Sequence, residues 1–193
     1  MPSAAAAPTP AFDYGSCGQE QGNSMREVDP WRFTGGFLTK VLSSRIPDQP
    51  THPEIPWAAA RKPLAESKLA LLSTAGISMR GDPPFDMEME RRKPIQGDPS
   101  WRRLRSDATS ATVEVHHLHI DTGYIERDLN VAVPLDRARE LVAEGVLGAI
   151  AESHYSIMGY QGNDSSTLEN VSAPEIAAAM RSEEVDLALL APV

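Results

Sequence analysis

The chain has 193 residues, of which 41% are hydrophobic, and a net charge of −9 that arises in residues 108–193, where 4 Lys and Arg face 14 Asp and Glu. This acidic half argues against nucleic-acid binding, the apolar runs fall well short of the roughly 20 residues of a membrane span, and the single cysteine, Cys17, cannot form an internal disulfide. We therefore expect one domain with a real core, in a cytoplasmic protein that binds neither nucleic acid nor membrane.

The first 63 residues have little of the pattern of a folded core. Residues 1–25 are rich in Ala, Pro, Gly, Ser and Gln, which predicts a disordered N-terminal extension. Residues 26–46 repeat apolar side chains at helical spacing and predict a short amphipathic helix. Residues 47–63 contain five prolines and predict an extended arm, so the α/β domain is expected to begin at residue 64 and to continue to residue 193.

The first strong strand signal is Lys68–Ser73, whose apolar character predicts a parallel strand covered on both faces. Residues 77–111 are polar and rich in Gly and Pro, so they predict one long loop. Thr112–Ile120 predicts the second strand of the same sheet.

The second half of the domain alternates helix and strand. Pro134–Glu144 predicts a helix that starts at a proline, and Val146–Ala151 predicts the third strand. Ser172 and Glu175 form a capping-box pattern, which predicts a helix from there to about residue 182, followed by a fourth strand at Val185–Leu190. This alternation predicts an α/β domain with three layers and a mostly parallel sheet of the Rossmann or flavodoxin type.

Histidines form the densest group of titratable side chains. On a strand, alternation would place His117 and His119 on one face and His116 on the other. Such a pair can bind a metal, with His154 as a third ligand, but ordinary hydrogen bonds to neighbouring loops explain the same pattern. The sequence contains neither an HExxH motif nor a cysteine ligand pair, so we predict no metal site.

The carboxyl ends of the predicted parallel strands are expected to meet at one edge of the sheet, where α/β proteins bind ligands. A turn at Thr74 and Gly76 follows the first strand, and a hydroxyl-rich loop at residues 153–160 follows the third; the latter either shapes a polar pocket or packs as a core-filling loop. Dinucleotide and P-loop motifs are absent, and no Ser, His and Asp have the spacing of a hydrolytic triad. The candidate substrate-pocket residues are Thr74, Gly76, His117, His119, His154 and Tyr155.

Six segments, each weak alone, occur in an order that points to a known family. They are residues 63–76, 81–86, 97–102, 128–137, 154–160 and 185–193. Over residues 56–193 the chain resembles the selenoprotein B subunit of glycine, sarcosine, betaine and D-proline reductases, most closely the D-proline branch. The resemblance implies an oxidoreductase subunit that reductively cleaves a C–N bond of an amino acid or amine-type substrate.

In that family the last strand is followed by selenocysteine or cysteine. The resemblance therefore places the catalytic nucleophile immediately after Val193, leaves no catalytic residue within the chain, and implies a chain truncated at that codon with a sheet incomplete at its C-terminus. It also implies a partner subunit whose pyruvoyl group binds the amine, a thiol or selenol redox carrier, and no cofactor in this chain. Two alternatives stay open: a non-catalytic binding or interaction module with the same fold, and a metalloenzyme built on the histidine cluster.

Overall fold

The computed structural model describes residues 36–37, 40, 58–92, 96–118, 120–162 and 164–193. Contacts divide the chain into two units, residues 1–49 and 50–193, and every described strand belongs to the second. The predicted N-terminal extension and the Pro-rich arm up to residue 57 lie outside the described residues. Of the predicted helix at 26–46, the structure describes residues 36, 37 and 40, which are helical.

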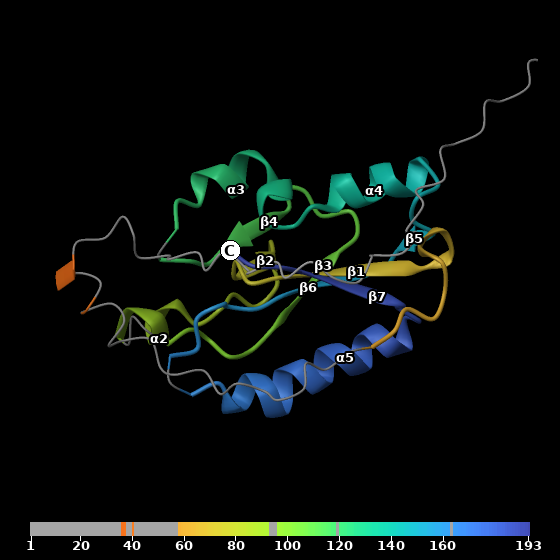
Figure 1. Ribbon diagram of the computed structural model, residues 1–193. Helices are drawn as coiled ribbons and strands as arrows, with labels where there is room; N and C mark the ends of the chain where they lie inside the picture. Colours follow the sequence, from red (N-terminus) through yellow and green to blue (C-terminus); the bar gives the residue numbers. More distant parts are fainter. Residues whose placement is uncertain (1–35, 38–39, 41–57, 93–95, 119, 163) are drawn as a thin grey trace, which may run out of the picture. The chain divides into compact units, whose positions relative to one another are not determined.

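One strand, β1 (Lys68–Ser73), forms the centre of the main sheet (Figure 1). Along one side it pairs in parallel first with β5 (Ala149–Ile150) and then with β6 (Ser153–Ser156). Along the other side it pairs in parallel with β7 (Leu187–Ala191). A further strand, β3 (Arg102–Arg105), pairs antiparallel with β6, so the sheet is mixed and mostly parallel, which confirms the α/β prediction.

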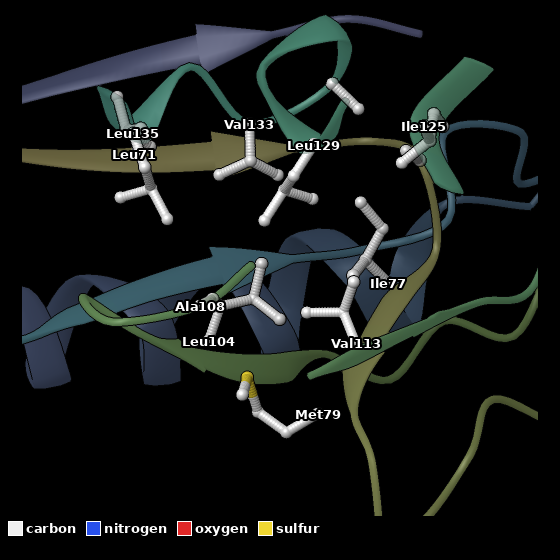
Figure 2. Close-up of a cluster of buried hydrophobic side chains, with 12 residues drawn as sticks. Leu71, Ile77, Met79, Leu104, Ala108, Val113, Ile125, Leu129, Val133 and Leu135 are labelled. Carbon is white, nitrogen blue, oxygen red and sulfur yellow. The ribbon is translucent and has the colours of Figure 1, made fainter. Parts of the chain in front are cut away.

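Helices lie on the two faces of this sheet. In Figure 1, α3 (Gly123–Arg127) and α4 (Leu135–Ala143) lie over one face, and α5 (Ala173–Ser182) lies over the other. The larger core cluster, shown in Figure 2, joins β1 to α3 and α4 through residues such as Leu71, Ile125 and Leu135. A smaller cluster lies around Tyr155 and Ile176 beneath α5. The specific Rossmann or flavodoxin form stays a prediction.

The long loop predicted at residues 77–111 is wrong. It contains β2 (Ile77–Met79), α2 (Met87–Arg92) and β3. The strand β3 was hidden by its composition, because three of its four residues are arginines and only Leu104 is fully buried. Two short 3-10 turns, η1 (Leu64–Glu66) and η2 (Leu129–Val131), lie elsewhere in the domain. No described helix has the length and apolar character needed to cross a membrane.

The second predicted strand is also largely wrong. Only β4 (Val113–Val115) forms, and it pairs antiparallel with β2 in a separate two-stranded sheet. Next to this pairing, the amide of His116 donates to the carbonyl of Gly76. Gly76 lies in the turn before β2, at φ +62°, so the pairing of the two strands stops at this point. His117 therefore lies beyond the strand, and the alternation expected for the histidines does not apply.

The third predicted strand at Val146–Ala151 forms only in part, as β5, and β6 replaces the start of the predicted loop at residues 153–160. All four side chains of β6 are buried although three are polar, and some of their polar atoms find partners inside the domain, whereas Nε2 of His154 has none among the described residues. The hydroxyl of Ser156, for example, accepts a hydrogen bond from the Ile77 amide at 2.8 Å.

The predicted helices at 134–144 and 172–182 and the last strand are confirmed as α4, α5 and β7. The capping box is wrong, because Ser172 is helical and ends a π-helical turn, η3 (Leu168–Ser172), that runs directly into α5. Its hydroxyl donates instead to the carbonyl of Pro99 at 2.6 Å, and Glu175 accepts a hydrogen bond from the indole of Trp101 at 2.8 Å. Both residues therefore tie α5 to the segment before β3.

Candidate functional site at the carboxyl edge of the sheet

Three loops meet where β1, β6 and β7 end. The amide of Gly76 donates to the carbonyl of Ile157 at 3.0 Å, and the amide of Gly159 donates to the carbonyl of Thr74 at 3.1 Å, so the loops after β1 and β6 are bonded to each other. On the other side, the amide of Thr74 donates to the carbonyl of Ala191 at 3.2 Å. The ends of the three parallel strands thus form one continuous platform at the edge where α/β proteins bind ligands.

The side chain of Thr74 fixes the backbone beyond β7. Its hydroxyl accepts a hydrogen bond from the amide of Val193 at 2.9 Å and reaches the carbonyl of the same residue at 3.4 Å. A side chain at Gly159 would interfere, since its Cβ would lie 2.9 Å from the Cβ of Thr74. Thr74 therefore extends the pairing of β1 and β7 past Ala191 with a side-chain hydrogen bond.

The turn after β1 leaves no amide for an anion. Gly76 has φ +62°, and a Cβ there would collide with the carbonyl oxygen of His116. The amides of Thr74 and Gly76 are bonded as described above, and the amide of Ala75 donates to the hydroxyl of Ser73 at 3.2 Å. Gly76 is thus required by the geometry of the turn, as the sequence indicated, rather than by close approach of a ligand.

A buried serine and a histidine pair next to this turn, which sequence reasoning missed. The hydroxyl of Ser78 lies 2.8 Å from Nε2 of His116, whose ring packs against Phe85 at 5.9 Å between centroids. Burial lowers the pKa of His116, against the opposing effect of Glu114. Ser78 has no exposed surface, so a substrate does not reach its hydroxyl, and the pair serves to hold β2 against the end of β4.

Of the other predicted histidine candidates, the structure describes His117 and His154. His117 is half-buried, and His119 lies outside the described residues. Over the described ranges, no three His, Cys, Asp or Glu side chains lie together in a way that would hold a metal ion. Any role of His117 or His119 in substrate binding stays a prediction.

His154 and Tyr155 lie inside the domain. His154 is fully buried, and its Nδ1 accepts a hydrogen bond from the amide of Leu71 at 3.0 Å. Burial, with a smaller effect of Arg139, lowers its pKa to about 4. Tyr155 is also fully buried, packs on Trp101 with ring centroids 5.7 Å apart, and has its pKa raised by burial. Both therefore lie beneath the platform rather than on it, and their proposed contact with substrate is untested.

The loop after β6 is supported by a clamp built around Arg102. Its guanidinium makes four hydrogen bonds at 2.6–2.8 Å, to the carbonyls of Pro83, Pro84 and Trp101 and to the hydroxyl of Ser100, and it pairs with the carboxylate of Asp98 at 3.5 Å. Arginine has five N–H donors in a fixed plane. Arg102 therefore joins the two Gly-Asp-Pro segments, residues 81–83 and 97–99, and most of its donors are engaged within the domain.

Asp98 connects this clamp to the platform. Burial by itself would raise the pKa of Asp98, but hydrogen bonds from Ser100 and from the Asp86 amide, together with Arg102, lower it. The Asp98 amide donates to the sulfur of Met158 at 3.2 Å, in the loop after β6. The two Gly-Asp-Pro segments are thus connected, through Asp98 and Met158, to the loop after β6 that forms part of the platform.

Comparison with known proteins identifies the family to which the chain belongs. The model of the family described as glycine/sarcosine/betaine reductase selenoprotein B matches residues 46–192. The chain is 32% identical over 153 residues to the D-proline reductase subunit gamma of Acetoanaerobium sticklandii, covering 79% of this chain and 59% of that protein. No solved structure matches the chain.

Two further relatives carry the description glycine reductase complex component B subunit gamma. The protein from Symbiobacterium thermophilum is 28% identical over 141 residues, covering 73% of this chain and 32% of that protein. The protein from Carboxydothermus hydrogenoformans is 28% identical over 173 residues, covering 89% of this chain and 38% of that protein. The chain thus spans less than two thirds of the length of each of these relatives.

Proposed function

The chain belongs to the glycine/sarcosine/betaine reductase selenoprotein B family, and from this premise we propose that it is part of a subunit of a multi-component reductase that cleaves a C–N bond of a small amino acid or amine. The observation that carries the proposal is the family match over residues 46–192, which includes every strand that ends at the platform. The names of the relatives support a subunit of a reductase complex, and the D-proline relative supports D-proline as the first substrate to test.

The proposal extends to the reactive group, which we place immediately beyond Val193 as a selenol or a thiol. Two features of the fold support this position. Val193 lies at the carboxyl edge of the sheet, and Thr74 holds its amide and carbonyl through one hydroxyl. A group attached there would emerge from a fixed strand end at the platform, where the loops after β1 and β6 surround it.

The chemistry then follows from a nucleophilic chalcogen. A selenolate attacks the α-carbon of the substrate, a Se–C bond forms, and the C–N bond breaks as the amine leaves with its electron pair and takes up a proton. A carrier with two thiols then supplies two electrons. One thiol attacks the selenium, the Se–C bond breaks and the α-carbon takes up a proton to give the product; the second thiol then displaces the selenol as the carrier becomes a disulfide. A pyruvoyl group on a partner subunit would hold the amine, so no residue of this chain is proposed to bind a cofactor. Thr74 and Gly159 position the attacking residue by fixing the strand that precedes it.

The gene sequence gives the first test. Reading past the codon of Val193 should show UGA or a cysteine codon, followed by an open frame with a cysteine a few residues on. Any other stop codon at that place contradicts the position of the reactive group.

The second test is enzymatic. The protein translated through that codon, assembled with its partner subunits, should consume D-proline or glycine with a dithiol as reductant. Thr74→Val should lower kcat by about tenfold or more, whereas Thr74→Ser, which keeps the hydroxyl, should retain most of it. Consumption of neither substrate would leave a binding or interaction module as the better description.

A further inference from the structure

The two outer strands of the sheet differ in how they face solvent. The strand β7 consists of Leu187, Ala188, Leu189, Leu190 and Ala191, and in the described part of the chain it pairs with β1 alone. Leu189 and Leu190 are 47% and 64% exposed. Soluble proteins normally blunt an open edge with charges, prolines or bulges inside the strand, and none of these occurs in β7.

The backbone of β7 is prepared for another partner. The carbonyl of Ala191 accepts from the Thr74 amide, so the backbone groups of Leu187, Leu189 and Ala191 face β1. Because these directions alternate along a parallel strand, the N–H and C=O groups of Ala188 and Leu190 point to the open side. An extended peptide placed there would gain main-chain hydrogen bonds and cover the exposed leucines.

The opposite edge of the sheet, formed by β3, is not suited to bind a further strand. In β3, Arg103 and Arg105 are exposed and only Leu104 is fully buried. Charged side chains of this kind protect an edge from further pairing. The sheet can therefore grow on the side of β7 and not on the side of β3.

We propose that β7 binds one further β-strand, contributed by the part of the reductase polypeptide that the longer relatives have and that this chain does not cover. The argument for this occupant is length: 41% of the D-proline reductase subunit gamma lies outside the matched region, since the chain covers 59% of it. The occupant presents apolar side chains toward Leu189 and Leu190. The inference depends on family membership and not on the proposed chemistry, so a protein without reductase activity would still bind this strand.

A second copy of the chain is the less favourable occupant. Two copies related by a two-fold axis would pair β7 with β7 antiparallel. Each copy carries a net charge of −9, and residues 108–193, which contain β7, hold 14 acidic against 4 basic residues. The resulting repulsion opposes self-association through this edge, whereas a separate strand need not be acidic.

Hydrogen exchange on the 193-residue chain tests the edge directly. The amides of Ala188 and Leu190 should exchange at least about a hundredfold faster than those of Leu187 and Leu189, because only the latter pair with β1. Sedimentation should show a monomer. Slow exchange at Ala188 and Leu190 in the chain alone, with or without a dimer, would show that another segment or copy already covers the edge, and would overturn the proposal.

The occupant is then identified with synthetic peptides. Overlapping peptides from the unmatched part of the Acetoanaerobium sticklandii subunit are added to the full chain, and exchange is measured again. One peptide, or two that overlap, should slow the amides of Ala188 and Leu190 by about tenfold or more and leave the amides of β3 unchanged. If no peptide protects these two amides, the proposal is wrong.

Matched variants distinguish pairing of the peptide with β7 from non-specific binding to exposed apolar side chains. Leu190→Lys should weaken binding of that peptide by about tenfold or more, because the charge lies on the exposed edge. Val131→Lys is the control, since Val131 is 60% exposed but lies in η2. If Leu190→Lys fails to fold, Leu190→Thr gives the same test with a smaller change. Equal loss of binding in the Val131 control would contradict docking at β7.

Discussion

Two helix-to-strand units flank β1, and they solve the same structural problem differently. In the first, α4 ends at Ala143 and the chain turns at Gly145 into β5 and β6; in the second, α5 ends at Ser182 and the chain turns at Glu184 into β7. Both helices end in the same arrangement, in which the residue after the cap has positive φ and the next amide reaches back to the last turn. The bonds are Val146 to Leu141 at 2.9 Å and Val185 to Met180 at 3.0 Å.

The strands that follow are regular in one unit and irregular in the other. From Leu69 to Leu72, β1 advances three residues while its partner advances five, from Ile150 to Tyr155. The two extra residues form a bulge, and Nδ1 of His154 takes the place of a backbone acceptor for Leu71. By contrast, β7 pairs with β1 residue for residue over five positions.

The comparison shows that regular pairing of a strand and coverage of both its edges by neighbouring strands are separate properties. The irregular strand has partners on both sides, β1 and β3, so it tolerates a bulge and a buried imidazole. The regular strand pairs on one side only in the described part of the chain, and its leucines stay exposed. We therefore expect substitutions of His154 to destabilise the protein through the first unit. At the helix ends, we expect replacement of Gly145 to destabilise the protein and replacement of Glu184 by glycine to stabilise it.

The largest effect is expected from His154→Ala. It leaves the Leu71 amide without its acceptor and opens a cavity beside a buried strand, so it should lower the free energy of unfolding by about 3 kcal/mol. Urea unfolding followed by circular dichroism measures the change. His154→Asn should recover part of the loss, because its side-chain oxygen can replace Nδ1 as acceptor.

Tyr155→Phe is the matched control for that experiment. Tyr155 is the next residue of β6, is equally buried, and has a hydroxyl with no partner among the described residues. Its loss should change stability by less than about 0.5 kcal/mol in either direction. A Tyr155→Phe effect as large as that of His154→Ala would show that the loss of stability is not specific to the hydrogen bond between His154 and Leu71.

The second effect is a pH dependence that arises at His154, in the first unit. The folded-state pKa of His154 is about 4 and its unperturbed value is 6.5, so the unfolded chain binds the proton more tightly. Stability from this group is therefore complete above pH 6.5 and is lost as the pH falls toward 4. Between pH 7.5 and pH 5 the loss should be about 2 kcal/mol.

Because other groups titrate in the same range, the quantity to measure is the difference between wild type and His154→Asn. Urea unfolding of both proteins at pH 7.5 and pH 5 gives it. Parallel loss of stability in the two proteins would mean that His154 is not the responsible group.

A third and smaller effect concerns the end of α4. Gly145 has φ +72°, and a Cβ there meets no atom within 4 Å, so Gly145→Ala changes only backbone strain. It should destabilise the protein by about 1 kcal/mol. Thermal and urea unfolding should agree, and a neutral result would indicate that the helix end relaxes to another conformation.

The smallest effect has the opposite sign. Glu184 adopts φ 55° in the position that Gly145 occupies in the other unit. Glu184→Gly removes this strain but adds freedom to the unfolded chain, so the net gain should be about 0.5 kcal/mol. Glu184→Ala, which keeps a Cβ, is the control and should give no such gain. Equal stabilisation by both variants would assign the effect to loss of the carboxylate.

The sequence predicted the helices and strands whose buried residues form a recognisable apolar pattern within the element itself. The strand Lys68–Ser73 is a run of apolar residues, and α4 and α5 have apolar stripes at helical spacing, so each was identified with bounds close to those observed. It missed β3 because a strand of three arginines and one leucine has almost no apolar signal. It extended the second strand through Ile120, although the partner strand β2 pairs with residues Val113–Val115 alone.

The candidate site divides in the same way. Thr74 and Gly76 were predicted at the end of β1, and the structure adds that Thr74 bonds to Val193 and that Gly76 turns the chain beneath His116. His154 and Tyr155 were chosen from the same loop, but the strand β6 extends into that loop and buries them both. No local signal in Ser-His-Tyr-Ser announces a buried strand, because its burial depends on β3, which lies about 50 residues earlier in the chain.

By itself, the sequence determined the α/β class, the central strand and the family, since these depend on residue patterns that are local or that recur in order along the chain. The tertiary structure alone decided which polar groups are usable. The hydroxyl of Ser78, Nδ1 of His154 and the amides of Thr74 and Gly76 find partners far away in sequence, and these hydrogen bonds remove them from contact with a ligand. A polar group has a role in binding only if the fold leaves it unpaired at the surface, and pairing is a property of three-dimensional neighbours that no local pattern contains.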